Sequence, residues 1–257
     1  MGRGTLSFPA NKIRKGERVM FPRKEIKSNA RAALKANYWP VVGILLLGSI
    51  LGGIVVGIAT VPSTMAQVSA QLAGEEYVPT VSTFSTCLSI VGGLLSMMFE
   101  VGIAWFAYRV YRGDAPEVSD LFVGFRNGNF GRVLGGMILV GVYTFLWSLL
   151  LIIPGIIKAY QYSMMPYLLI DRPDLSIKEC FAMSKKMTSG FKWSLFILEL
   201  SFIGWAILAV FTVGILDIFF VTPYMTLAMA GAYDYLKRTR MDDVATVEQS
   251  VEGTFAE

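Results

Sequence analysis

Long apolar runs dominate this sequence, and each is at least about 20 residues long, the length at which a helix spans a lipid bilayer. The runs cover residues 40–61, 86–108, 133–170 and 193–236. Only 16% of the 257 residues are charged, whereas roughly a quarter of the residues in an average soluble domain are charged. This pattern excludes a water-soluble fold of this size and predicts an all-α integral membrane protein.

Two of the runs are too long for one crossing. The run over residues 133–170 has 38 residues and the run over 193–236 has 44, while a helix rises about 1.5 Å per residue across an apolar layer about 30 Å thick. We expect one hairpin that turns at Pro154 and Gly155, with a short second arm, and another that turns near residues 212–214. The prediction is therefore six transmembrane helices arranged as three hairpins.

Basic residues mark one side of this topology. Of the 23 Lys and Arg residues, 10 precede the first run, 4 lie within 109–132, 5 lie within 172–192 and 3 follow residue 236. Lys158 is the one that remains. Because basic residues accumulate in cytoplasmic segments, we expect a multi-pass protein of the cell membrane with both termini in the cytoplasm and a polar loop over residues 62–85 outside.

Composition divides the chain into three parts. Residues 1–21 form a basic N-terminal extension, residues 22–236 form the six-helix membrane domain, and residues 237–257 form an acidic cytoplasmic tail. The last 17 residues hold five acids and no base, which is typical of a mobile, solvated tail.

We expect amphipathic helices at the cytoplasmic membrane interface. A capping box at Ser176 and Glu179 begins one of them. Its apolar side, which should face the bilayer, carries Ile177, Cys180, Phe181, Met183 and Met187. The residues expected to contact anionic head groups come from its basic side and from an N-terminal basic stripe: Lys178, Lys185, Lys186, Lys24, Lys27, Arg31 and Lys35.

A second capping box, at Asp114 and Glu117, predicts a short amphipathic helix through Leu121, Phe122 and Phe125. Cys87 and Cys180 are expected to be packing residues rather than a disulfide.

Small residues recur in the first apolar run. Gly48 and Gly52 lie four residues apart, as do Gly53 and Gly57. This spacing lets another helix backbone approach closely. It leaves open an association with a membrane-protein partner or with a second copy of the chain.

Four charged residues within the apolar runs are candidate sites, because a charge there is costly and invites a functional interpretation: Glu100, Glu199, Lys158 and Asp217. Lys158 and Asp217 could form an ion pair that joins two hairpins, or Lys158 could extend to the outer interface. Glu100 and Glu199 could hold a proton or bind a cation, or each could be protonated and hydrogen-bonded to a neighbouring helix.

Several chemistries are disfavoured by composition. The sequence has no His, the commonest general base and metal ligand, and only two Cys, too few for a thiolate metal cage. It also has no phosphate-binding loop and no nucleophile elbow. We therefore predict no enzyme activity, no catalytic residue, no cofactor and no metal. No aromatic residue is interleaved with the charges of the N-terminal basic stripe, which argues against nucleic-acid binding.

Three segments resemble a family of bacterial membrane proteins known as domain of unknown function 975. They are RKEIKSNARAALKANYW, the long central stretch from LWSLLLIIPGIIKAY to MTSGFKW, and SFIGWAIL with VTPYMTLAMAGAYDYL. The resemblance covers residues 22–236 and implies a multi-pass membrane protein without an assigned activity. More distantly, the chain is similar to the membrane region of some glycerophosphodiester phosphodiesterases, whose catalytic barrel it lacks. The first 19 residues look like an extension of the family region, so Met20 is an alternative initiator.

The expected function is that of a non-enzymatic accessory, scaffold or protective factor for another membrane system. The alternative is a carrier for a small amphiphilic molecule, lipid or cation, with Glu100 and Glu199 near its path. Helices interrupted at Pro154 and Pro223 fit the alternative, because broken helices often line transport sites. A lipid-directed intramembrane enzyme is a third, weaker interpretation.

Overall fold

A computed structural model describes residues 21–74, 83–126 and 128–254 of the chain, with side chains as far as residue 240 apart from those of residues 55 and 59. Across these ranges the protein is helical and contains no β-strand, which confirms the predicted all-α class. The elements are α1 (Arg23–Ala36), α2 (Tyr38–Ala73), α3 (Thr83–Arg112), the 3-10 helix η1 (Val118–Phe125), α4 (Phe130–Leu150), α5 (Ile152–Tyr162), α6 (Met165–Asp171), α7 (Ile177–Thr188), α8 (Lys192–Leu200), α9 (Ile203–Phe211), the π-helix η2 (Asp217–Val221) and α10 (Thr222–Thr254).

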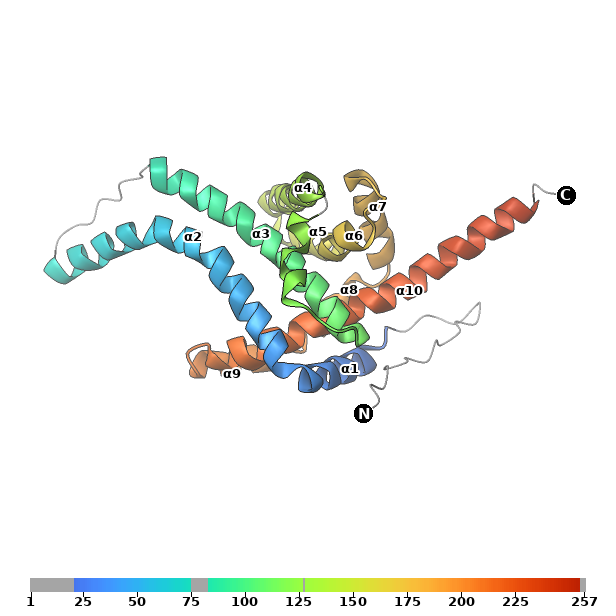
Figure 1. Ribbon diagram of the computed structural model, residues 1–257, viewed down its shortest axis with the longest axis horizontal. Coiled ribbons are helices and arrows are strands. Elements are labelled where there is room, and N and C mark those ends of the chain that lie inside the picture. Colours follow the sequence, from blue (N-terminus) through green and yellow to red (C-terminus); the bar gives the residue numbers. More distant parts are fainter. Residues whose placement is uncertain (1–20, 75–82, 127, 255–257) are drawn as a thin grey trace.

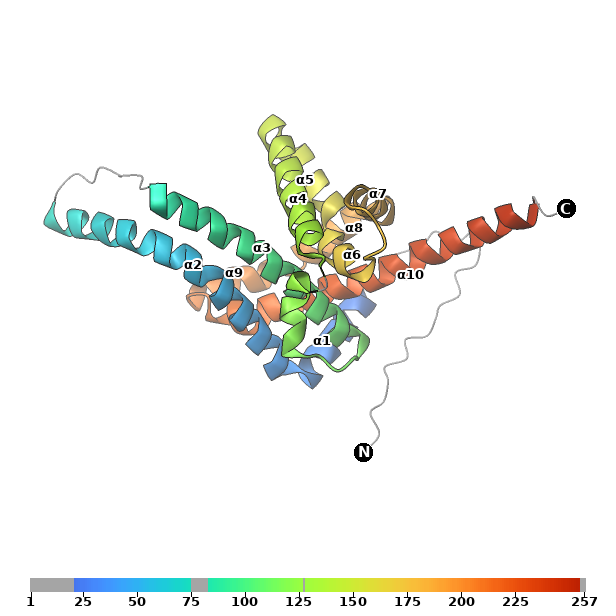
Figure 2. The same cartoon turned by 45° about the horizontal axis from the view of Figure 1, so that its top comes forward.

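The helices radiate from a shared centre (Figures 1 and 2). The pair α2 and α3 extends to one side and α10 to the other, while α4 and α5 form a third projection. Buried side chains concentrate where α1, the second half of α3, η1, α6 and the first half of α10 meet. Large exposed apolar side chains instead follow the outer parts of α2, α3, α4 and α9. The chain thus builds a compact core at one end of its helices and leaves the other ends apolar and uncovered.

Four helical segments are long and apolar enough to cross a membrane: Tyr38–Ile58, Thr83–Arg112, Phe130–Leu150 and Lys192–Phe211. The last of these joins α8 and α9 across a break at Ser201 and Phe202. These segments suggest membrane association.

The region expected to form a hairpin at Pro154 and Gly155 breaks earlier, at Leu151, whose backbone is extended. Pro154 lies in the first turn of α5, where its missing N–H costs no helical hydrogen bond. The second arm, expected as one helix over residues 156–170, is divided into α5 and α6. Pro166 in the first turn of α6 explains why α5 cannot continue, since its ring would clash with the preceding turn.

The polar loop expected to begin at residue 62 is instead helical as far as Ala73. Pro62 lies inside α2, and nearby hydroxyls satisfy backbone carbonyls: Thr64 Oγ1 and Ser63 Oγ both donate to the Thr60 carbonyl, at 3.0 and 2.8 Å. The helix ends at Gly74, in the left-handed conformation that favours glycine. Glu75 and Glu76 lie outside the described residues.

Close packing of α2 on α3 uses one of the two predicted small-residue pairs. A Cβ at Gly48 would lie 2.8 Å from Ile103 Cδ1, and one at Gly52 would lie 2.8 Å from Ser96 Oγ. The same positions at Gly53 and Gly57 have no atom within 4 Å. The first pair therefore serves contacts within the chain, and the second faces open space.

The two predicted capping boxes have different outcomes. The box at Ser176 and Glu179 is confirmed, because Ser176 receives the Glu179 N–H and the Glu179 carboxylate receives the Ser176 N–H. The box expected at Asp114 and Glu117 is wrong. The capping box lies three residues later, where Glu117 pairs with Asp120 at the start of η1. Here the Arg109 guanidinium holds the Asp120 carboxylate in place.

The apolar side of α7 packs against other helices of the chain. Cys180 and Met187 are fully buried, and the Phe181 ring meets the rings of Tyr143 and Tyr162 edge-on at 5.5 and 5.1 Å. The expectation that this side faces the bilayer is therefore wrong. The same hydrophobic arc buries itself against α5 and α6, which sequence periodicity cannot distinguish from lipid.

The acidic tail expected from residue 237 is also different, because α10 continues without a break to Thr254. Cys87 and Cys180 are both free, as expected, but Cys87 is exposed and only Cys180 packs.

Candidate functional site

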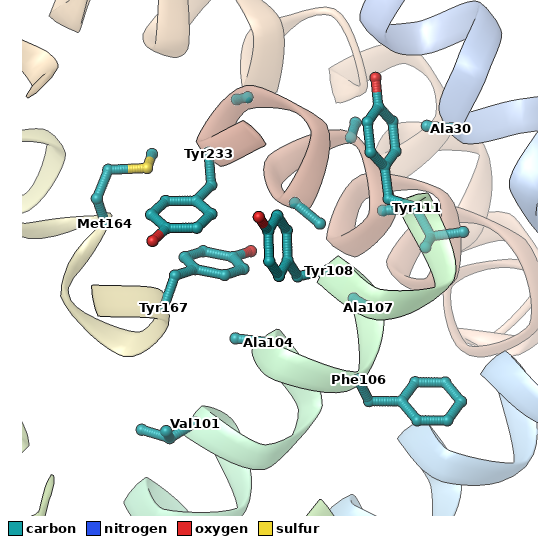
Figure 3. Packing of buried hydrophobic residues seen from close by; sticks show 14 of the residues in the cluster. Ala30, Val101, Ala104, Phe106, Ala107, Tyr108, Tyr111, Met164, Tyr167 and Tyr233 are labelled. Carbon is teal, nitrogen blue, oxygen red and sulfur yellow. The ribbon is translucent and has the colours of Figure 1, made fainter. Parts of the chain in front are cut away.

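Three tyrosines from distant parts of the sequence meet at the centre of the core, one each from α3, α6 and α10 (Figure 3). The rings of Tyr167 and Tyr233 stack with centroids 4.7 Å apart and an angle of 13° between their planes. Tyr108 meets Tyr233 edge-on at 5.1 Å. Aromatic pairs in these arrangements contribute about 0.5–1.5 kcal/mol beyond their buried area, so this contact helps to hold the three helices together.

The hydroxyls of Tyr108 and Tyr233 are part of a charged network. Tyr233 donates a hydrogen bond to Asp171 Oδ2 at 2.7 Å, and Lys237 Nζ lies 2.6 Å from the same oxygen. Lys237 also donates to the Tyr108 hydroxyl at 3.4 Å. We call Tyr108, Tyr167, Asp171, Tyr233 and Lys237 the tyrosine cluster. Its carboxylate is neutralised and hydrogen-bonded inside the chain, which suits a structural joint rather than a reactive group.

A second ion pair fixes η1 to α3. Arg109 Nη1 contacts both oxygens of the Asp120 carboxylate at 2.7 Å, and Arg109 Nη2 donates to the Ala115 carbonyl at 2.8 Å. Gly102 allows this close packing, because a Cβ at that position would overlap the Leu121 backbone.

Sequence reasoning missed the tyrosine cluster, although α10 carried a signal. Tyr233 and Lys237 are four residues apart, as are Asp234 and Arg238, which form an ion pair of 2.8 Å. This spacing places each pair on one face of a helix. Their partners on α3 and α6 are far away in sequence, and no local pattern connects them.

Glu100, a predicted intramembrane site, lies in α3 with an exposed side chain. Across the described residues Glu100 makes no hydrogen bond and no ion pair. The carboxylate is therefore not part of the tyrosine cluster.

Glu199 has a partner of its own. Its Oε2 accepts a hydrogen bond from the Tyr160 hydroxyl, which joins α8 to α5. Nearby, Lys192 Nζ donates to Gln161 Oε1 at 3.3 Å. Glu100 and Glu199 therefore have different neighbours, and the second fits the hydrogen-bonded alternative described above.

Lys158 and Asp217 do not form the expected ion pair. Lys158 Nζ lies 4.5 Å from the centre of the Trp147 ring, a cation–π contact between α5 and α4. Asp217 Oδ2 instead accepts a hydrogen bond from Thr222 Oγ1 at 3.1 Å. Because α5 packs against α4, the lysine meets the neighbouring tryptophan rather than η2.

In the N-terminal basic stripe, one lysine contacts another part of the chain and other lysines are exposed. Lys27 Nζ donates to Ser201 Oγ at 2.9 Å and lies 4.4 Å from the centre of the Phe202 ring. Burial and the nearby charge of Arg31 lower the pKa of Lys27. Lys24 and Lys35 are exposed, so these two remain able to contact other molecules.

The α7 lysines all face outward. Lys178, Lys185 and Lys186 are exposed, while Cys180 on the opposite side is buried. Burial raises the pKa of the Cys180 thiol, with Arg132 beside it as the main opposing influence. A raised pKa keeps a thiol protonated and unreactive.

A metal site has no support in the part of the chain that the structure describes, where no three His, Cys, Asp or Glu side chains gather.

Residues 20–160 and 148–240 match the family described as "Protein of unknown function (DUF975)". The chain belongs to this family. The matched region begins where the sequence resemblance placed the end of the N-terminal extension. The searches of curated proteins and of solved structures found no match.

Proposed function

We propose that this DUF975 member is a non-enzymatic protein of the cell membrane that acts as an accessory, scaffold or protective factor for another membrane component. The observation that carries the proposal is the division between a packed core and uncovered helices. In the four candidate spans, at most 35% of the apolar window is buried by the chain itself. A carrier encloses its solute among packed spans, whereas diverging spans offer their faces to lipid and to other membrane proteins.

The proposed topology keeps six crossings in three hairpins. Contacts between α2 and α3, between α4 and α5, and between α9 and η2 support such pairing. In this arrangement α5 with α6, and η2 with the first part of α10, are the two return arms. The basic residues of α1, of the end of α3, of α7 and of α10 would then lie on the cytoplasmic side with both termini.

The basic surfaces of α1 and α7 are the proposed contacts with anionic head groups. Each helix packs its apolar side on the core and leaves lysines exposed. A basic residue near an anionic surface contributes about 1 kcal/mol. The exposed lysines of both helices would therefore orient the core against the bilayer. Lys24 and Lys35 are also the proposed contacts with an acidic partner protein.

The test is purification of the tagged full chain directly into lipid nanodiscs, followed by mass spectrometry of bound proteins and lipids. We expect a protein partner or a second copy in fixed proportion. The Lys24→Gln, Lys35→Gln variant should lose this partner or second copy, because both side chains are exposed and available for an external contact. Lys178→Gln with Lys186→Gln is the matched control, which removes the same charge from α7. A chain that carries neither a partner nor a second copy would contradict the proposal.

A carrier for a small amphiphile, lipid or cation is the second candidate, and the exposed Glu100 favours it. An unpaired carboxylate in an apolar helix is a common feature of transport paths. Flux of amphiphilic cations into liposomes containing the protein tests this idea. If the wild-type chain supports flux and the Glu100→Gln, Glu199→Gln double variant does not, the carrier function is favoured over the scaffold function.

A further inference from the structure

The turn between α9 and η2 borders an open surface hollow whose lining is apolar except for one carboxylate. Its volume is about 390 Å³, and it is lined by Ala206, Ala209, Val210, Val213, Gly214 and Asp217. Asp217 is thus a lone carboxylate in an otherwise apolar surface. Ala206, Ala209 and Val210 belong to the candidate span Lys192–Phe211, and Asp217 lies beyond the end of that span.

Two backbone features shape this hollow. Val213 has φ of 53°, in the left-handed region that a β-branched residue rarely adopts. Asp217 opens a π-helical turn, a distortion that is frequent at functional sites. Hydrogen bonds maintain the turn: Gly214 N donates to the Ala209 carbonyl at 2.9 Å, and Leu216 N donates to Thr212 Oγ1 at 3.1 Å. The strained turn is therefore held in place, with Asp217 at its edge.

The carboxylate of Asp217 lacks a cation. Its one side-chain hydrogen bond comes from Thr222 Oγ1, and it forms no ion pair with any basic residue in the described ranges. A charge in apolar surroundings is costly without a partner. An external cation at this point would supply the missing counter-charge.

We propose that the hollow binds a single-chain amphiphile with a primary ammonium head, its N–H groups on Asp217 and its chain along Ala206 and Val210. A divalent metal ion would need about six oxygen ligands, and one carboxylate with one hydroxyl does not provide them. A quaternary ammonium group is bound by aromatic rings, and the lining has none. An aminophospholipid would bring its phosphate close to the same carboxylate, with no basic lining residue to balance it.

The volume agrees with this ligand class. Pockets for small organic molecules measure roughly 300–1,000 Å³, and 390 Å³ is near the lower end. This size suits one alkyl chain. The inference is independent of the scaffold proposal, because the site could regulate either a scaffold or a carrier.

Photo-crosslinking tests the proposal on the full chain in phosphatidylcholine nanodiscs. The probe is dodecylamine with a diazirine in its chain, and the matched uncharged probe is the corresponding dodecanol. We expect the amine to label the peptide containing residues 203–221 and the alcohol to label it far less. Asp217→Asn, which can still accept the Thr222 hydrogen bond, should lower labelling about tenfold, equivalent to about 1.4 kcal/mol.

Asp217→Glu should restore labelling, and Ala206→Leu, which fills the hollow but keeps the carboxylate, should abolish it. Asp174→Asn is the control for removing an acidic charge elsewhere. Equal labelling by the alcohol, or unchanged labelling of Asp217→Asn, would overturn the proposal and mark the hollow as ordinary lipid-facing surface. Competition by phosphatidylethanolamine nanodiscs as effective as competition by free dodecylamine would also overturn it, because the occupant would then be an aminophospholipid.

Discussion

The tyrosine cluster and the α9–η2 hollow each contain a carboxylate in apolar surroundings, but the two carboxylates have different partners. Asp171 has Lys237 at 2.6 Å and receives the Tyr233 hydroxyl. Asp217 receives one hydroxyl, from Thr222, and forms no ion pair within the described residues. The first charge is balanced inside the chain and can stabilise the fold. The second adds little to stability and remains available to a ligand.

The largest expected effect follows directly from this contrast. Asp171→Leu leaves Lys237 partly buried without its counter-ion and should lower the free energy of unfolding by about 3 kcal/mol. Asp217→Leu removes an isolated carboxylate from an apolar surface and should leave stability unchanged or higher. Denaturant unfolding of the full chain in detergent measures both.

The double variant Asp171→Leu, Lys237→Met tests the reason for the loss. If the unpaired lysine causes it, the double variant will be more stable than Asp171→Leu alone. Equal losses for Asp171→Leu and Asp217→Leu would contradict the distinction between the two sites.

A second effect compares glycines in the core and on the uncovered helices. Gly102→Ala would force a methyl group into the Leu121 backbone and should cost about 1–3 kcal/mol. Gly57→Ala meets nothing within 4 Å and should gain about 0.5–1 kcal/mol from better helix propensity. The same unfolding assay applies. A loss of stability in Gly57→Ala would show that this position packs against another chain.

Sequence patterns predicted the features that depend on local order. The capping box at Ser176 and Glu179 was found because its partners are three residues apart, and the turn at residues 212–214 because it divides an overlong apolar run. The all-helical class followed from the length and composition of the runs.

The features that were missed depend on contacts between distant segments. The partners of Asp171 lie on α10, more than sixty residues later, at sequence separations of 62 and 66. For Lys158, the charge suggested an acidic partner, Asp217. The packing of α5 on α4 instead places the Trp147 ring beside the lysine.

A smaller effect is expected at the contact between α5 and α8. Tyr160→Phe removes the hydroxyl that donates to Glu199 and should cost about 1 kcal/mol. Tyr143→Phe on α4 is the matched control, since the Tyr143 ring contacts Phe181 through its aromatic face and edge. If both variants lose the same stability, the Tyr160 hydroxyl contributes nothing specific.

The smallest effect concerns pH and the start of α7. Hydrogen bonds from the Ser176 hydroxyl and backbone N–H lower the pKa of Glu179 below its ordinary value of 4.5. A carboxyl whose pKa is lowered by folding stabilises the folded state above its unfolded pKa, and this contribution is lost as pH falls through the folded pKa. Hydrogen exchange of the first-turn amides of α7, compared at about pH 6 and about pH 3 after correction for intrinsic rates, should show reduced protection at the lower pH. Glu179→Gln should show the same protection at both values, because its amide does not titrate. A wild-type chain with equal protection at both pH values would mean that the charge of Glu179 does not contribute to this helix start, in contrast to Asp171, whose charge is held between α6 and α10.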